Sequence, residues 1–292
     1  MKRLSLTLTA ATVALAAPFV DAPQAQAAAF NDASLPVFSE LTIDTITAKV
    51  TKGINLTDDS TGSLGAFSDF YYSDGVTTLD FNSAPQAVAG QENAYTFGDD
   101  SMVFTFDKEM GKNGSKVRSD RWAPSGANGE RNESDYLSIF PGNALTIDLE
   151  NSLNYFGMNW GALSRNNTFE FFQVDDSGSE TSLGMFNYDK LFSQSGDSVL
   201  PTLAEHQNEY NGYVHFYAND AGGLFNRIRV SQVDRDGGGF ETDNYSFRVS
   251  DRSFDFETGQ DATDVPEPSV LLGLGAVVAG LAARRRKSLA AM

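Results

Sequence analysis

Oxygen-bearing side chains gather in one short stretch of the chain in a pattern that could bind a cation. Residues 234–244 are Asp-Arg-Asp-Gly-Gly-Gly-Phe-Glu-Thr-Asp-Asn, so that acidic residues flank three consecutive glycines. Hard oxygen ligands on a flexible loop are what Ca²⁺ prefers. The candidate calcium ligands are Asp234, Asp236, Glu241, Asp243 and Asn244.

This stretch does not follow the EF-hand pattern. Gly238 stands where that loop has its third acidic ligand, and Tyr245 stands where it has its bidentate glutamate. Two interpretations remain: a calcium site of another geometry, or a solvated hairpin loop followed by a capping Asp/Asn pair. The departures from the EF-hand pattern favour the second interpretation.

A second group of residues could hold a sugar ring. Trp122 lies in a long polar stretch, from Lys108 to Asp135, that is rich in Gly, Ser and Asn and carries six cations. An exposed aromatic face beside amide and guanidinium donors can grip a sugar through apolar stacking and hydrogen bonds. We therefore consider Trp122, joined by Tyr71 and Tyr72, as candidate glycan contacts. The alternative is that Trp122 folds back and caps the open end of the domain, which is what a lone tryptophan usually does, so this interpretation is favoured.

The motifs of common hydrolases are missing. The chain has no G-x-S-x-G elbow, no H-E-x-x-H pair and no Gly-rich phosphate loop. Gly196-Asp197-Ser198 is similar to the start of a GDSL-type block, but Val199 and Leu200 follow it, and neither His206 nor His215 has an aspartate three residues before it. We expect no catalytic residues. A secreted glycan-active hydrolase stays an alternative, because paired carboxylates are defined by their spacing in three dimensions.

The composition limits the range of functions. Lys and Arg number 21 against 39 Asp and Glu, which gives a formal net charge of −18. Nucleic-acid binding needs basic patches, so we exclude it. The absence of cysteine excludes disulfides, iron–sulfur centres, thiolate zinc and a thiol nucleophile. We expect no cofactor apart from the candidate Ca²⁺.

Period-two alternation predicts the elements that would position these residues. In 144–149, for example, Leu145, Ile147 and Leu149 fall on one face of an extended chain. Short strands at regular spacing, separated by Gly, Asn and Asp, favour an all-β fold, an antiparallel and jelly-roll-like β-sandwich over residues 30–262. Strands are predicted at 41–50, 67–72, 101–107, 136–140, 144–149, 155–160, 168–174, 181–186, 213–217, 226–230 and 245–249.

Some local features within this pattern are more specific. Pro141-Gly142-Asn143 predicts a hairpin-type turn. Within 168–174, Phe169 and Phe171 share one face whereas Phe172 takes the other, which predicts a β-bulge or burial on both faces. Trp160 is assigned to the core. Outside the two ends of the chain, only 201–210 shows a helical period.

The N-terminus has the features of a secretory signal peptide. Lys2 and Arg3 precede an apolar stretch from Leu4 to Ala17, and Ala25-Gln26-Ala27 is an A-x-A cleavage site. We therefore expect residues 1–29 to form a signal helix that is removed when the general secretion machinery exports the chain.

The C-terminus combines a proline-flanked acid, an apolar run and a cluster of cations. Val265-Pro266-Glu267-Pro268 precedes the run Val270 to Ala283. That run would form a helix of roughly 20 Å, shorter than the ~30 Å hydrocarbon core of a bilayer. Arg284, Arg285 and Arg286 follow it and would stay on the cytoplasmic side. We expect a short hydrophobic membrane helix, and we treat 263–292 as a sorting segment separate from the folded domain.

This combination resembles the PEP-CTERM sorting signal of Gram-negative bacteria. In that family an exosortase, an integral-membrane cysteine protease, recognises the Pro-Glu-Pro segment and removes the tail during export. The resemblance implies an exosortase partner and a precursor that is transiently tethered to the inner membrane. It also implies a mature protein at the cell surface or in the extracellular matrix.

A second resemblance covers about half of the predicted domain. Segments 136–142, 145–149 and 154–161 are similar to a group of exosortase-dependent surface proteins found in cyanobacteria and relatives, and 225–228 and 240–244 fit its closing strands. The group is defined by its sorting signal and not by an activity. It supports the location and the fold and leaves the chemistry open. We expect a non-enzymatic surface or matrix protein associated with exopolysaccharide. The alternatives are a carbohydrate-binding module, with or without calcium, and the glycan-active hydrolase.

The sorting hypothesis predicts that the mature protein has lost its tail. Mass spectrometry of the protein from its native host should show a C-terminus that precedes Val270. The same protein from a strain without exosortase should retain Val270 to Lys287. An intact tail in both strains would contradict the hypothesis.

Overall fold

The computed structural model describes residues 37–97, 99–111, 115–163, 166–192, 202–203, 210–232 and 238–263. Within these residues the chain is mostly antiparallel β-sheet arranged as a sandwich, which confirms the predicted fold class. The predicted signal helix, the sorting segment from residue 264 onward and most of 201–210 lie outside the described residues. No helix in the described part is long and apolar enough to cross a membrane.

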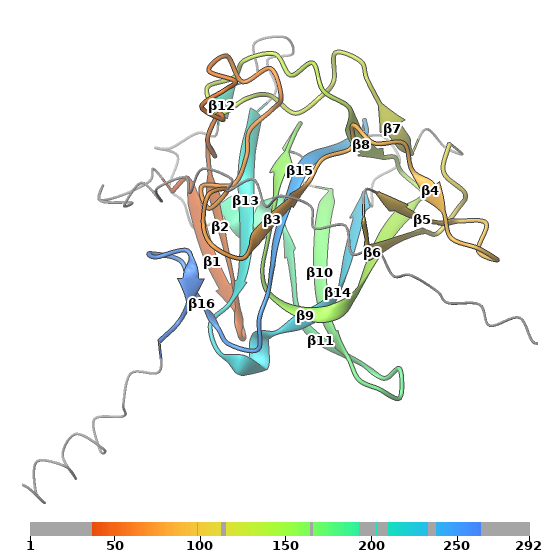
Figure 1. Ribbon diagram of the computed structural model, residues 1–292, viewed down its shortest axis with the longest axis vertical. Coiled ribbons are helices and arrows are strands. Elements are labelled where there is room, and N and C mark those ends of the chain that lie inside the picture. Colours follow the sequence, from red (N-terminus) through yellow and green to blue (C-terminus); the bar gives the residue numbers. More distant parts are fainter. Residues whose placement is uncertain are drawn as a thin grey trace, which may run out of the picture. The chain divides into compact units, whose positions relative to one another are not determined.

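Most of the elements are short, and β9 is the longest strand (Figure 1). The described helices are α1 (Tyr188–Phe192) and the 3-10 helix η2 (Ala221–Gly223). The strands are β1 (Ser39–Ile43), β2 (Ile46–Thr51), β3 (Val76–Leu79), β4 (Gln86–Ala87), β5 (Ala94–Phe97), β6 (Asp99–Phe106), β7 (Lys116–Arg118), β8 (Tyr136–Ile139), β9 (Ala144–Trp160), β10 (Asn167–Val174), β11 (Glu180–Asn187), β12 (Thr202–Leu203), β13 (Tyr210–Ala218), β14 (Phe225–Gln232), β15 (Phe240–Val249), β16 (Phe254–Asp255) and β17 (Gln260–Asp261).

The long strand β9 belongs to both layers of the sandwich. Its first half pairs with β6 and β14, and its second half pairs with β13 and β15. One layer therefore has the order β5-β6-β9-β14-β10-β11, and the other has the order β1-β2-β13-β9-β15. Figure 1 shows β9 curving as it passes from one set of partners to the other. The sequence predicted two strands, 144–149 and 155–160, where the structure has this one bent strand.

The residues of β9 that face the core change from odd to even numbers along the strand. Leu145 and Ile147 are buried in the first half, and Phe156, Met158 and Trp160 are buried in the second. A slip of one residue moves every following side chain to the other face, so the strand needs a bulge at this point. The register with β14 and the register with β15 both shift beside the middle of β9.

Aromatic rings fill the space between the layers. Phe169 of β10 has its ring centroid 5.1 Å from that of Trp160 and 4.9 Å from that of Phe216. Tyr245 of β15 lies 5.3 Å from Phe156 in an edge-to-face contact. Burial of one such side chain contributes about 1.5–3 kcal/mol, so these rings dominate the energy of the core. The assignment of Trp160 to the core is confirmed.

The predicted bulge in 168–174 is confirmed, because the pairing of β10 with β11 shifts between Phe171 and Phe172. Two other predictions were wrong. Segment 41–50 forms β1 and β2 and not one strand, since Asp44, with φ 51°, begins a turn. Segment 67–72 is a series of turns in which Phe67 and Phe70 are buried. Its strand pairing is limited to one bridge between Phe67 and Ile54, and Phe70 packs onto Tyr155 of the sheet. Aromatic composition alone cannot distinguish such a segment from a strand.

The turn at Pro141-Gly142-Asn143 has a different role from the one predicted. It is a tight turn, with Gly142 at φ 82°, but β8 and β9 on either side of it do not pair with each other. β8 pairs with β7 and β15, whereas the first half of β9 pairs with β6 and β14. The turn therefore carries the chain from one layer to the other.

Loops cover the outer face of the layer that contains β13, β9 and β15. Residues 52–75 form the first loop and residues 119–135 form the second loop (Figure 1). The two loops are joined by backbone hydrogen bonds, from the Ala66 amide to the Ser125 carbonyl (3.2 Å) and from the Glu133 amide to the Ser63 carbonyl (2.7 Å). Both faces of this layer are therefore buried.

A buried histidine attaches the first loop to the sheet. Nε2 of His215 lies 2.9 Å from Oδ2 of Asp69, and its Nδ1 lies 2.8 Å from the hydroxyl of Tyr155. That hydroxyl also lies 2.6 Å from Oγ of Ser68. All four side chains are buried. Buried polar groups of this kind require partners, so the histidine has a structural role.

Asparagine side chains also attach both loops to the sheet. Asn159 of β9 donates to the Ser125 carbonyl of the second loop (2.9 Å), and Asn132 of that loop donates to Oδ2 of Asp243 on β15 (2.9 Å). Asn244 donates to the carbonyls of residues 64 and 66, at 2.8 and 3.1 Å. These bonds supplement the apolar contacts between loops and sheet, in which Phe70 packs on Tyr155 and Ala127 packs on Tyr213, and they require each loop to keep one position.

This packing predicts that Gly157 cannot carry a side chain. A Cβ at this position would lie 2.6 Å from the Tyr155 hydroxyl and 2.7 Å from Cε1 of Tyr213. We expect Gly157→Ala to lower the free energy of unfolding by about 1–3 kcal/mol, as overpacking does in other cores. Urea denaturation measures this change. Gly238→Ala is the control, because its Cβ would meet no atom within 4 Å. Equal stability of both variants would contradict the packing described.

Candidate functional site

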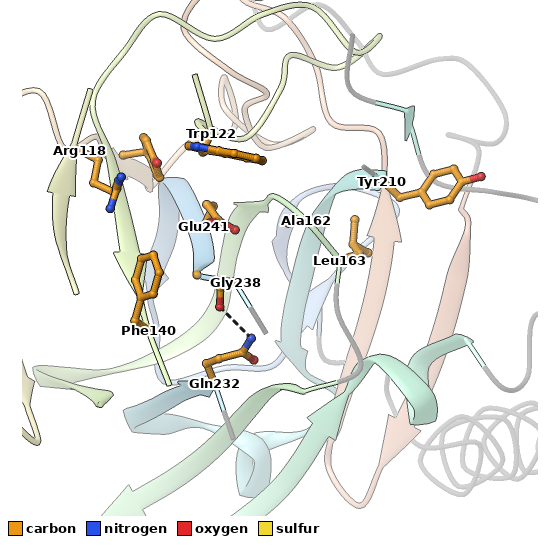
Figure 2. A pocket seen from close by; sticks show the side chains of 11 residues that line it. Arg118, Trp122, Phe140, Ala162, Leu163, Tyr210, Gln232, Gly238 and Glu241 are labelled. Carbon is orange, nitrogen blue, oxygen red and sulfur yellow. Dashed lines mark hydrogen bonds between the residues drawn. The ribbon is translucent and has the colours of Figure 1, made fainter. Parts of the chain in front are cut away.

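A cavity of about 610 Å³ lies at the end of the sandwich where β9 and β14 finish and β15 begins. Figure 2 shows the Trp122 ring on one side and Gln232 on the opposite side, with Phe140 and Leu163 between them. The side chain of Glu241 points into the middle of this space. The volume and the mixture of apolar and polar walls are those of small-molecule binding sites.

Asp120 organises the wall that contains the tryptophan. Its Oδ1 accepts hydrogen bonds from the Trp122 backbone amide (3.1 Å) and the Tyr136 hydroxyl (2.7 Å). Its Oδ2 accepts from both Nε (2.9 Å) and Nη2 (2.6 Å) of Arg118. Charge-assisted bonds of this kind are stronger and more directional than neutral ones. The carboxylate therefore ties the second loop to β7 and β8.

The ionisation of Asp120 and Tyr136 reflects these contacts. Partial burial alone would raise the pKa of Asp120, but the hydrogen bonds from Tyr136, Arg118 and the Trp122 amide hold it below its usual range. Burial raises the pKa of Tyr136 well above its usual range, and the hydrogen bond to Asp120 and the negative charges of Asp120 and Glu241 raise it further. Tyr136 therefore stays a neutral donor.

The Trp122 ring is held in place but remains accessible. The guanidinium carbon of Arg121 lies 4.8 Å from the ring centroid, in a cation–π contact. Trp122 is 37% exposed, and Arg121 is not among the residues that line the cavity. The sequence left two arrangements open, an exposed ring that contacts a glycan and a ring that folds back as a cap. In the structure the ring has a fixed position and borders the cavity.

The opposite side of the cavity is attached to the core. The side chain of Gln232 accepts a hydrogen bond from Asn167 (3.0 Å) and donates to the Gly238 carbonyl (3.2 Å; Figure 2). Asn167 in turn accepts from the indole N–H of Trp160 (2.8 Å). The sequence analysis missed Gln232 and Asn167, because neither lies in a motif and they come together only when β10 pairs with β14.

Comparison with known families characterises the far end of the chain. Residues 264–287 match the PEP-CTERM protein-sorting motif. The chain carries an exosortase sorting signal. The matched segment includes Val265, Pro266, Glu267 and Pro268 as well as the arginines 284–286. The protein is therefore exported and processed by exosortase, and its precursor is anchored in the membrane. A comparison with curated proteins finds no match.

In this exosortase substrate the three predicted glycan contacts do not lie together at one site. Trp122 borders the cavity, whereas Tyr71 and Tyr72 do not line it. Tyr71 contacts Phe67 and Tyr72 edge-to-face, with centroids 5.2 and 4.9 Å apart, and the Tyr72 hydroxyl lies 3.2 Å from Oγ1 of Thr57. Both tyrosines belong to the first loop. The cations of the polar stretch were noticed in the sequence, but the role of Arg118 at Asp120 was not.

The predicted calcium ligands are also divided. Asp234 and Asp236 lie outside the described residues, and Glu241 lines the cavity. Asp243 accepts hydrogen bonds from Asn132 (2.9 Å) and Ser134 (3.0 Å). These bonds lower its pKa, but burial has the larger effect and raises the pKa to about 7.

Asn244 donates its side-chain amide to backbone carbonyls of the first loop, so it and Asp243 are both occupied within the protein. Within the described ranges no group of three or more acidic, histidine or cysteine residues could hold a metal ion. Calcium binding stays a prediction.

The role of Asp120 predicts a measurable change in Trp122. The other tryptophan, Trp160, is buried, so acrylamide quenching of fluorescence reports mainly on Trp122. We expect Asp120→Asn to increase quenching, because it removes the charge-assisted bonds. In the unmodified protein, Asp120 stabilises the fold fully when the pH is above the usual aspartate pKa of about 3.9. The pKa of Asp120 in the folded protein is lower, so this stabilisation is lost only as the pH falls through that lower pKa. Quenching should therefore rise only in strong acid.

Asp176→Asn provides the control for this measurement, because Asp176 lies in the exposed turn between β10 and β11. It should leave both the quenching and its pH dependence unchanged. Circular dichroism at each pH distinguishes a local release of Trp122 from global unfolding. Unchanged quenching in Asp120→Asn would contradict the role given to Asp120.

Proposed function

We propose that the mature domain is a non-enzymatic surface protein that binds exopolysaccharide through the Trp122 cavity. The observation that carries this proposal is a positioned aromatic ring bordering an open cavity that also contains a carboxylate and a guanidinium. Aromatic faces contact the apolar face of a sugar, while planar charged groups hydrogen-bond to its hydroxyls. The sorting signal brings the domain to the surface, where such polymers occur.

The rigidity of the cavity supports binding. Trp122 is held through its backbone by Asp120 and through its ring by Arg121. Gln232 is held by Asn167 and by the Gly238 carbonyl. Side chains that are already ordered lose little entropy when a ligand binds, so more of the contact energy appears as affinity.

The carboxylates at the cavity argue against glycoside hydrolysis. That reaction needs two carboxyl groups flanking the bond, one of which has a raised pKa and acts as the acid. Asp120 accepts four hydrogen bonds, and its pKa is lowered. It is a structural group and not a proton donor. Of the described residues that line the cavity, Glu241 is the one that carries a carboxylate.

The proposal predicts that Trp122→Ala weakens glycan binding. Removal of a central aromatic contact commonly costs about 2 kcal/mol or more, so we expect affinity to fall by more than about tenfold. Glycan arrays identify the ligand, and calorimetry measures its affinity with and without EDTA. Tyr72→Ala is the matched control, because Tyr72 is 43% exposed but does not line the cavity.

The possible outcomes bear on different parts of the proposal. Failure of every glycan to bind, or equal binding by Trp122→Ala, would remove the cavity as a glycan site. Loss of affinity or of thermal stability in EDTA would establish calcium dependence. Release of shorter oligosaccharides after incubation with the protein would show that it is an enzyme.

A further inference from the structure

Exposed aromatic rings gather at one end of the domain. Among the residues that the structure describes, six large apolar side chains are exposed, and three of these are aromatic: Tyr72, Trp122 and Tyr210. Trp122 and Tyr210, each 37% exposed, both border the cavity to which we assign glycan binding. Single exposed apolar residues are ordinary on a protein surface, but two aromatic rings at one cavity indicate a contact surface.

The two rings come from different segments and lie apart. Trp122 belongs to the second loop, whereas Tyr210 is the first residue of β13. Figure 2 shows the rings separated from each other, with the Tyr210 ring turned away from the middle of the cavity. A single sugar that lies against Trp122 therefore does not cover Tyr210.

An uncharged turn forms the wall on the side of the cavity that leads to Tyr210 (Figure 2). Ala162 and Leu163, which follow the end of β9, both line the cavity. Leu163 packs against the core but is only partly buried, so part of its side chain stays accessible. A ligand that extends from Trp122 toward Tyr210 would pass over an apolar surface.

The backbone of Tyr210 has a fixed position at this rim. Its carbonyl accepts a hydrogen bond from the Leu163 amide (2.9 Å), and it pairs with Leu203 of the short strand β12. Ala162 has φ 48°, in the left-handed region that residues other than Gly rarely adopt. Strained residues of this kind concentrate at ligand sites, where the surrounding structure holds them. The turn thus keeps Leu163 beside the start of β13.

From these observations we infer that the domain binds several consecutive sugars of one polysaccharide chain, with Trp122 and Tyr210 as separate stacking platforms. This inference rests on the proposed function and deepens it. One sugar lies against Trp122 in the cavity, and the chain passes Leu163 so that a later sugar lies against Tyr210. Tyr210 is therefore a specificity residue that distinguishes a polymer from a short sugar. Stacking on these rings needs no charge on the ligand.

Fragments of one polysaccharide test the inference. Exopolysaccharide from the native host, partially hydrolysed with acid, is separated into disaccharide, tetrasaccharide and hexasaccharide fractions. Calorimetry should show that affinity rises with length in the unmodified protein, because only the longer chains reach both rings. Tyr210→Ala should lower the affinity for the hexasaccharide by about five- to tenfold and for the disaccharide by less than about twofold. Trp122→Ala should weaken the binding of every fraction.

Two control variants locate the effect. Tyr210→Phe keeps the ring and should keep the affinity for the hexasaccharide, which separates stacking from a contact of the hydroxyl. Tyr72→Ala removes an exposed ring that does not line the cavity, and it should leave every affinity unchanged. Circular dichroism and thermal unfolding establish that each variant is folded. Added salt gives a further check. Contact with an uncharged ring is not screened, so the loss of affinity in Tyr210→Ala should stay the same.

The outcomes separate this inference from the proposed function. Equal affinity of the unmodified protein for the disaccharide and the hexasaccharide would overturn the inference and leave glycan binding intact. A folded Tyr210→Ala variant that binds the hexasaccharide normally, that weakens all fractions equally, or whose loss disappears in salt would also overturn it. Absence of binding by every fraction would overturn the inference. Only failure of the intact polysaccharide and of every arrayed glycan, or no effect of Trp122→Ala, would remove the proposed function as well.

Discussion

Polar groups buried on the outer face of one sheet layer impose the main constraint on this structure. His215 and Tyr155 from the sheet bond to Asp69 and Ser68 of the first loop, and Asn159 and Asn244 from the sheet bond to the loop backbones. A buried polar group without a partner costs roughly 1–3 kcal/mol. Each loop must therefore lie where these partners meet. In the second loop this requirement acts together with a small apolar contact, in which Ala127 packs against Ala66 and Tyr213.

The position of the cavity follows from two features of the backbone. The bend in β9 brings its end beside the end of β14 and the start of β15, which places Gln232 and Glu241 at one end of the sandwich. The second loop then closes that end with Trp122. Asp120 joins the two features, because it bonds both to the loop and to β7 and β8.

Sorting and binding are divided between two parts of the chain. The matched sorting motif begins at residue 264, immediately after the last described residue. The hairpin β16–β17 ends the described domain, and Asp261 accepts hydrogen bonds from Asn154 (2.8 Å), Ser250 (2.6 Å) and Arg248. These bonds tie the last described hairpin to β9 and β15.

The sequence alone determined the fold class, most of the strands, the bulge in β10 and the sorting signal. These features depend on neighbours in the chain: alternation with a period of two, turn residues, and a proline-flanked acid before an apolar run. Only the tertiary structure decided that β9 is one strand shared by two layers and that Asp243 and Asn244 serve the protein interior. It also separated Tyr71 and Tyr72 from Trp122 and placed Glu241 beside it. Those relations join residues up to 180 positions apart, as in the bond from Asn244 to the Leu64 carbonyl, and no local pattern of side chains encodes the strand pairing that brings them together.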